Sequence, residues 1–359
     1  MKVTQLYTKC LAHGAYFISS NGEAAVIDPL RETEPYVQLA KEEGVKIKYI
    51  FETHFHADFV SGHLDLARET GAQIVYGPTA VPNFDAYVAK DDEAFKVGNL
   101  SVVVLHTPGH TMESSTFLLR DENGVDQAIF SGDTLFLGDV GRPDLAQKAA
   151  NMTREELAGL LFDSLRNKIM PLNDDITVYP GHGQGSACGK SMSSETVDTL
   201  GNQKATNYAL RADMTREEFI AEVTDGLLKP PGYFPKNATM NKMGYESIKE
   251  VQSRGTRAFS ADEFEAESRN DNAIILDARP ASDFINGFIP GAISIGISGD
   301  FAPWVGIVVE DIKAPIYLVV NEDQLEEAVI RLARVGYDNV QGYLKGGMDA
   351  WKAAGKHVS

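Results

Sequence analysis

The sequence predicts an α/β protein made of two domains. At ~100–200 residues per domain, a chain of 359 residues has room for two or three domains. Short runs of β-branched and apolar residues alternate with stretches of helical spacing, which is typical of layered α/β folds. Polar residues with metal-binding chemistry recur where such runs end, which is where α/β sheets place their functional sites.

The elements of the first domain follow from local pattern. Gly44 and Gly71 are expected to end two helices, because glycine adopts the left-handed conformation found just past helix ends. The pattern predicts helices over 34–43 and 64–70 and strands over 24–27, 47–51, 101–105 and 128–130.

The pattern changes after residue 210. An amphipathic helix is expected over 214–228, followed by an extended, proline-rich segment at 229–235. The polar stretch 246–260 is interpreted as a linker between a domain at 1–245 and a second α/β domain at 261–359. In the second domain we expect strands over 273–276 and 316–320 and helices over 281–286 and 324–334.

Composition limits the partners and the compartment. The 33 basic and 51 acidic residues give a net charge of −18, which argues against nucleic acid and anionic membranes because both require a basic face. Only Cys10 and Cys188 are present, so a disulfide framework is excluded and a reducing cytoplasm is favoured. Neither an apolar leader nor a run of about 20 apolar residues is found, so no membrane association is expected.

The strongest functional signal is the segment 53–63, THFHADFVSGH. On an extended backbone, side chains two residues apart share a side, so His54, His56 and Asp58 converge. Two imidazoles and a carboxylate are suitable ligands for a first-row transition metal. His110, Asp133 and His182 each stand on a glycine-containing turn after a strand-like run, and together with the first segment they predict one metal centre.

This ordered set of motifs resembles the metallo-β-lactamase superfamily over residues 1–240, in particular its glyoxalase-II-like branch, which includes persulfide dioxygenases. The resemblance implies an αββα sandwich. Dinuclear hydrolases of the superfamily read H-x-H-x-D-H, whereas here Phe59 follows Asp58. The second metal position therefore lacks an imidazole, which favours a mononuclear centre.

Carried over by position, the resemblance implies one Fe(II) per chain held by His56, His110 and Asp133, which are also the expected catalytic residues. His54 is assigned to orienting ligands or bound water, with direct ligation left open, and Asp58 and His182 are expected beside the centre. The implied activity is the oxidation, by O2, of the sulfane sulfur of a low-molecular-weight thiol persulfide to sulfite, in sulfide detoxification. The thiol carrier is open between glutathione, coenzyme A and similar thiols.

Three further residues have two interpretations each. Arg142, in a G-R-P-D stretch, either binds a substrate carboxylate or pairs with Asp144. Tyr179 either hydrogen-bonds substrate or packs in the core. Cys188 lies in a glycine-rich loop after His182, where it either carries a persulfide, with its pKa lowered by Lys190, or is an ordinary half-buried residue.

Residues 261–359 resemble a rhodanese-like domain. The motifs are Asp277-Ala278-Arg279, the segment 287–292 (GFIPGA, with phenylalanine for the usual histidine) and the segment 346–351 (GGMDAW). Active rhodaneses carry a nucleophilic cysteine after the central strand, whereas the corresponding segment here, 321–324, reads NEDQ. We therefore expect no sulfurtransferase turnover, an internal Asp277–Arg279 ion pair, and a role in binding a sulfur-transfer partner, bracing the first domain or self-association.

Two alternative functions are considered. One is a dinuclear zinc thioester hydrolase of glyoxalase-II type. The other is a sulfur-carrier or sensing protein with a vestigial metal site, in which Cys188 and the rhodanese-like domain would act. A homodimer is the default expectation for the assembly.

Overall fold

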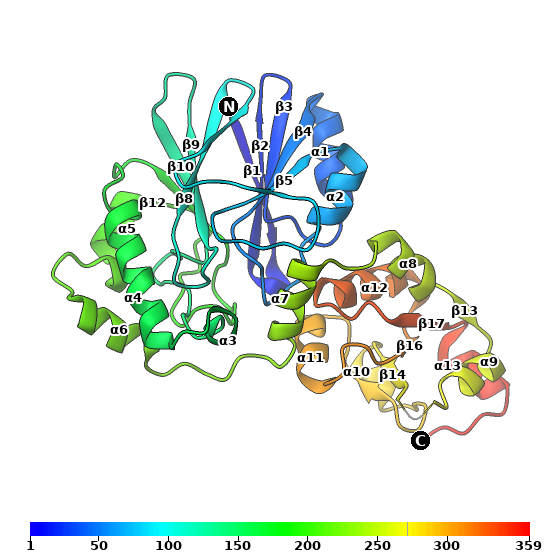
Figure 1. The fold of residues 1–359 in the computed structure, drawn as a ribbon. Coiled ribbons are helices and arrows are strands. Elements are labelled where there is room, and N and C mark those ends of the chain that lie inside the picture. The colour runs from blue at the N-terminus through cyan, green and yellow to red at the C-terminus, as the bar shows by residue number, and fades with distance from the viewer. Residues whose placement is uncertain (271) are drawn as a thin grey trace. The chain divides into compact units, whose positions relative to one another are not determined.

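The computed structural model describes residues 1–270 and 272–359, and the chain forms two compact units (Figure 1). The first unit comprises Met1–Pro230 and Asn241–Gly244. The second unit comprises Pro231–Met240 and Tyr245–Ser359. The chain therefore passes from the first unit to the second, returns briefly, and then completes the second unit.

The first unit contains two six-stranded sheets. In spatial order, the strands of one sheet are β1 Lys2–Thr8, β2 His13–Ser20, β3 Glu23–Ile27, β4 Lys46–Glu52, β5 Gln73–Tyr76 and β6 Tyr87–Val88. Those of the other are β12 Asp198–Thr199, β11 Thr177–Pro180, β10 Asp126–Gly132, β9 Ser115–Arg120, β8 Leu100–His106 and β7 Ala94–Val97.

Helices cover the outer face of each sheet, which gives four layers (Figure 1). The helices of this unit are α1 Glu34–Glu43, α2 His63–Thr70, α3 Gln147–Ala150, α4 Arg154–Ser164, extended by a π-helical turn, α5 Leu200–Thr206 and α6 Arg216–Thr224. An apolar cluster that includes Phe51, Phe117 and Phe130 lies between the sheets, and two further clusters join each sheet to its helices. The expected αββα sandwich is confirmed.

Strand direction explains where the polar residues gather. β3 and β4 run parallel, so Asp28 and Thr53, which directly follow them, lie at one edge of their sheet. β10 and β11 are also parallel, so Asp133 and His182 emerge together from the other sheet. An isolated bridge between His13 and His182 joins the two sheets at this edge.

The second unit is built on a parallel five-stranded sheet. Its strands, in spatial order, are β13 Ala258–Phe259, β17 Val340–Leu344, β16 Ile316–Val319, β14 Ile274–Asp277 and β15 Ile293–Ser294. Its helices are α8 Ile248–Gly255, α9 Ala261–Glu267, α10 Ala281–Phe284, α11 Phe301–Val308, α12 Leu325–Arg334 and α13 Gly347–Ala353. Phe264 of α9 and Trp351 of α13 pack with Tyr317 of β16 in its core.

The structure differs from the sequence expectation around residues 214–260. The helix expected over 214–228 spans Arg216–Thr224: Thr215 and Glu218 form a capping box, and Asp225 and Gly226 (φ 65°) leave helical geometry. The segment 229–235 is not extended to its end, because α7, Phe234–Met243, begins inside it. Proline is tolerated in a first helical turn, where its missing N–H is not needed. The stretch 246–260 holds α8 and β13 of the second unit.

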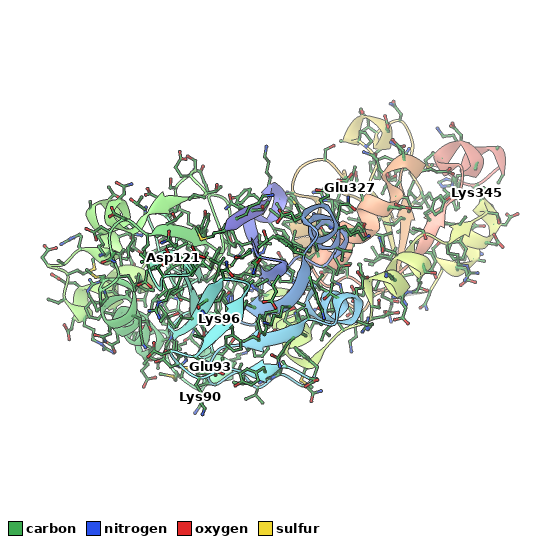
Figure 2. All side chains as sticks on the ribbon, turned by 90° about the horizontal axis from the view of Figure 1, so that it is seen from above. Lys90, Glu93, Lys96, Asp121, Glu327 and Lys345 are labelled. Carbon is green, nitrogen blue, oxygen red and sulfur yellow. The ribbon has the colours of Figure 1, made fainter. Side chains whose placement is uncertain are left out.

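Charged side chains lie mainly on the outside of each unit. The exposed residues Lys90, Lys96, Glu327 and Lys345 are labelled in Figure 2. Within residues 1–270 and 272–359, every helix is too short or too polar to cross a lipid bilayer.

Candidate metal centre

The loop after β4 carries three of the expected site residues and is fixed by a residue distant in sequence. The Asn241 side-chain amide donates to the backbone carbonyls of His56 and Phe59, at 2.8 Å each, and its oxygen accepts from the Ser61 N–H at 2.9 Å. Backbone groups in such a loop cannot pair within a strand or helix, so a buried side chain satisfies them instead. Asn241 therefore holds the histidine loop in one conformation.

His54, His110 and Asp133 form one group whose ligand atoms all lie within 4.8 Å of one another. Asp133 Oδ2 is 4.0 Å from Nε2 of His54 and 3.4 Å from Nε2 of His110. All three side chains are buried. Of the trio expected from sequence, His110 and Asp133 are in this group, and the third member is His54 rather than His56.

The hydrogen bonds of the two imidazoles fix which nitrogen faces the centre. His110 Nδ1 is 2.9 Å from the carbonyl oxygen of Arg142, which can only accept, so Nδ1 carries the proton. His54 Nδ1 is 3.0 Å from Thr53 Oγ1. The Thr53 hydroxyl donates its hydrogen to Asp28 Oδ2, at 2.8 Å, so it can only accept from His54. His54 Nδ1 is then the donor as well. Both Nε2 lone pairs face Asp133, as ligating histidines require.

This arrangement calls for a cation. Two nitrogen lone pairs and a carboxylate oxygen converge in the interior of the unit. A buried carboxylate that faces two lone pairs is costly unless a positive charge compensates it. Burial and the neighbouring imidazoles hold the pKa of His54 well below its usual value, which favours the neutral, ligating form.

His56 points its Nε2 elsewhere. That atom lies 3.1 Å from Asp28 Oδ1 and 3.4 Å from Glu52 Oε2. Burial by itself would lower the pKa of His56, but the two carboxylates outweigh it and raise that pKa well above its usual value. Nε2 of His56 is therefore part of a buried ionic network, in which Glu52 also reaches His63 Nδ1 at 3.3 Å.

Asp58, His182 and Cys188 lie on the other side of Asp133. His182 Nε2 is 3.3 Å from Asp58 Oδ2 and 3.6 Å from Asp133 Oδ1. Cys188 belongs to a group with Asp133 and His182. Burial, followed by the charges of Asp58 and Asp133, raises the pKa of the Cys188 thiol well above its usual value. The ammonium of Lys190 bonds to the carbonyls of Glu222 and Asp225, and the thiol pKa is not lowered as the sequence suggested.

Phe59 fills the position where the hydrolase motif has histidine. Its ring is fully buried, with centroid distances of 4.3 Å to His13 and 4.4 Å to His56. It contributes an apolar face and no ligand atom at this position.

The structure places Arg142 and Tyr179 outside the group of ligand atoms. Arg142 makes a two-pronged pair with Asp144, at 2.7 and 2.8 Å, as one of its interpretations expected. It affects the centre through its carbonyl, which holds His110. Tyr179 is half-buried and stacks on Phe130 at 5.1 Å and 11°. These contacts match the structural interpretations of both residues.

Sequence reasoning missed four residues around the centre: His13, Asp28, Glu52 and Asn241. His13 is fully buried, with its ring 5.7 Å from His56 and 5.3 Å from His182. Asp28 and Glu52 had a usable signal, because each acidic residue ends a strand-like apolar run. Asn241 had none, since it contacts the loop from a helix about 180 residues later.

In the second unit, the expected Asp277–Arg279 ion pair is present, at 2.6 Å between Oδ2 and Nη2. The segment 321–324 is polar and largely exposed, and the Glu322 carboxylate accepts from the N–H of Gly346. A nucleophilic side chain is absent from this described segment.

Comparison with known families identifies two matches. Residues 9–182 match the metallo-beta-lactamase superfamily, and residues 260–354 match the rhodanese-like domain. A crystal structure of a metallo-beta-lactamase from Staphylococcus aureus subsp. aureus COL is 32% identical, with a TM-score of 0.83, and the match covers 95% of this chain and 98% of that one. The two-part architecture is therefore shared with a solved structure.

Two curated relatives differ in activity. The human mitochondrial persulfide dioxygenase ETHE1 is 31% identical over 201 residues, covering 55% of this chain and 70% of the relative. The hydroxyacylglutathione hydrolase GloC of Haemophilus influenzae is 29% identical over 193 residues, covering 48% and 85%. Identity alone does not separate an oxygenase from a hydrolase, so the side chains must decide.

Proposed function

This chain belongs to the metallo-β-lactamase superfamily and carries a rhodanese-like domain, and on that basis we propose that it is a persulfide dioxygenase. The substrate would be a low-molecular-weight thiol persulfide, and the overall reaction RSSH + O2 + H2O → RSH + SO3²⁻ + 2H⁺. The carrier R is glutathione, coenzyme A or a similar thiol.

The observation that carries this proposal is the donor set. His54, His110 and Asp133 offer two imidazole nitrogens and one carboxylate oxygen, the set used by non-haem Fe(II) oxygenases. We propose these three as the ligands, with His54 in place of the His56 that sequence reasoning favoured. When bound, Fe(II) would supply the open coordination positions and the redox chemistry that O2 requires and that zinc lacks.

The protein's own contribution is orientation and exclusion of water. Thr53 and the Arg142 carbonyl hold the protons of His54 and His110 on Nδ1, so both Nε2 atoms stay available. The ligand side chains are buried, which limits the access of bulk water to reactive sulfur species. Asp58, His182 and Cys188 line the side of Asp133 that faces away from the ligand imidazoles.

A dinuclear zinc thioester hydrolase is the second candidate, favoured by the similarity to hydroxyacylglutathione hydrolases. Phe59 counts against it, because the hydrolase motif has a histidine at this position and Phe59 brings no ligand atom. The proposal of a sulfur carrier with a vestigial metal site is disfavoured by the convergence of two imidazoles and a carboxylate in the first group.

The test is anaerobic metal loading followed by O2 uptake with glutathione persulfide and coenzyme A persulfide. We expect one iron per chain and equal amounts of O2 consumed and sulfite formed. His54→Ala should lose the iron, whereas His56→Ala should retain it with an affinity about 10–100-fold lower, as for loss of a supporting partner. Iron-loaded protein that takes up no O2, together with zinc-loaded protein that cleaves S-lactoylglutathione, would establish the hydrolase instead.

A further inference from the structure

We propose that Tyr233 and Asn241 are positioning residues for the metal centre, and that the rhodanese-like unit influences metal affinity through them. Tyr233 directly precedes helix α7, Phe234–Met243, and Asn241 lies in the last turn of that helix. The boundary between the two units falls inside the helix, between Met240 and Asn241. This role rests on His54 as a metal ligand, as proposed above, but not on the reaction that the metal supports.

The start of α7 is packed tightly within the second unit. Tyr233 is 4% exposed, and its ring lies so close to α11 that a Cβ on Gly306 would come within 2.3 Å of Cδ1. Asn237 is fully buried, and its Oδ1 would lie 2.4 Å from a Cβ on Gly336. Glycine permits this close approach because it has no Cβ. The second unit therefore determines where the helix begins.

The end of the same helix is held by the first unit. Asn241 makes three hydrogen bonds to the backbone of the loop 56–61, at 2.8–2.9 Å, and its side chain is 1% exposed. Water is therefore not available to replace the amide as a partner for these backbone groups. One residue later, the Lys242 carbonyl accepts from the Asn83 N–H at 2.8 Å. The position of α7 thus determines the conformation of the histidine loop.

A helix transmits a displacement because its own hydrogen bonds make it stiff. Tyr233 and Asn241 are eight residues apart, which corresponds to about 12 Å at the rise of an α-helix. Hydrogen bonds weaken steeply with distance, so a shift of the helix by about 1 Å is enough to break those of Asn241. The backbone directly after His54 would then lose its support. This mechanism gives the second unit a task that needs no nucleophile.

The test compares Asn241→Asp with Gly306→Ala in the full chain. Asn241→Asp keeps the size and the acceptor of the side chain but removes both N–H donors. Gly306→Ala changes only the second unit, where the new Cβ displaces the Tyr233 ring. Amide hydrogen exchange of the segment 53–63 is measured on metal-free protein, and Fe(II) affinity is measured by anaerobic competition with a chelator.

Both variants should loosen the histidine loop. Asn241→Asp should speed exchange of the segment 53–63 by at least about tenfold and weaken Fe(II) binding about 10–100-fold. Gly306→Ala should change both quantities in the same direction, with a loss of Fe(II) affinity of about tenfold. The fold should survive, because the Ser61 hydroxyl still anchors the loop to the Pro29 carbonyl at 2.9 Å.

Gly255→Ala is the matched control within the second unit. Its new Cβ would crowd Val329 of α12, at 2.8 Å, rather than the start of α7. This variant should leave exchange of the segment 53–63 and Fe(II) affinity as in the wild type. Equal effects of Gly255→Ala and Gly306→Ala would show general destabilisation and overturn the proposal.

A double-mutant cycle tests the route. Gly306→Ala should have no further effect in the Asn241→Asp background, because the bonds that carry the displacement are already lost, whereas additive effects overturn the proposal. If Gly306→Ala does not fold, Lys236→Met replaces it, since it removes only the half-buried ammonium that donates to the Glu310 carbonyl. Unchanged exchange of the segment 53–63 in Lys236→Met would then overturn the proposal. O2 uptake by iron-loaded wild type reports separately on the proposed function.

Discussion

Replacing Thr53 by valine tests whether a single hydroxyl orients His54. The Thr53 hydroxyl donates to Asp28 Oδ2 at 2.8 Å and accepts from His54 Nδ1 at 3.0 Å. Valine keeps the shape and the β-branch, and the backbone N–H of residue 53 still reaches Asp28 Oδ1 at 2.7 Å. The substitution therefore removes two buried hydrogen bonds with little change in packing.

The expected losses follow from these two bonds. Each buried group left without a partner costs about 1–3 kcal/mol of folding stability. Loss of the residue that orients a ligating histidine lowers metal affinity about 10–100-fold, which corresponds to about 1.4–2.8 kcal/mol. Both effects should therefore appear in the same variant.

The assays are urea unfolding of the metal-free protein and anaerobic competition for Fe(II) with a chelator. Thr116→Val is the matched control, because Thr116 is also buried and its hydroxyl forms a hydrogen bond with that of Thr107. When this bond is lost, the Thr107 hydroxyl still has a hydrogen bond to the Thr134 hydroxyl, at 2.8 Å. The control should lose stability by less than about 1.5 kcal/mol and keep its iron affinity. Equal iron affinities in the Thr53→Val variant and the wild type would refute the tautomer argument.

Three further predictions concern other parts of the chain. The pKa of Cys188 is raised, so iodoacetamide should label Cys10 but not Cys188 in native metal-free protein at pH 7–9, and rapid labelling of Cys188 would contradict a buried, protonated thiol. In the unfolded chain this thiol loses its proton at a lower pH than in the folded protein. Cys188 should therefore lower the free energy of unfolding only as the pH rises above about 8.5. Arg142→Lys should cost about 1–3 kcal/mol in urea unfolding, whereas Arg211→Lys, in an exposed pair, should leave the stability close to that of the wild type; equal costs would count against the buried pair. With thiosulfate and cyanide the full chain should form no thiocyanate, and turnover that survives the double substitution Cys10→Ser and Cys188→Ser would reveal an unrecognised nucleophile other than cysteine.

Local pattern predicted a layered α/β fold and a second α/β domain because their strands are short, apolar and bounded by glycine or polar turns, whereas the αββα sandwich was implied by the family resemblance. The strands expected over 47–51 and 101–105 are the cores of β4 and β8, and the helices expected over 34–43 and 64–70 are α1 and α2 within a residue. Such elements depend on local pattern alone. The histidine and aspartate motifs also converge in space, because they stand at the ends of neighbouring strands.

What sequence could not supply is orientation. His54 and His56 share a side of the loop, and only the positions of Asp28 and Glu52 decide which imidazole nitrogen faces Asp133. Asn241 determines the loop conformation from α7, an element that the prolines before it concealed. These are tertiary effects, and they do not appear in the periodicity of any segment.

The parallel pairing of β10 with β11 has a consequence for how this protein tolerates change. Asp133 and His182 owe their closeness to the register of two adjoining strands, with Phe130 opposite Tyr179. The intervening polypeptide, including α3 and α4, leaves this edge and returns to it. Insertions or deletions there can reshape the surroundings of the centre while its donor atoms stay in place, so substrate preference is free to diverge without loss of the metal.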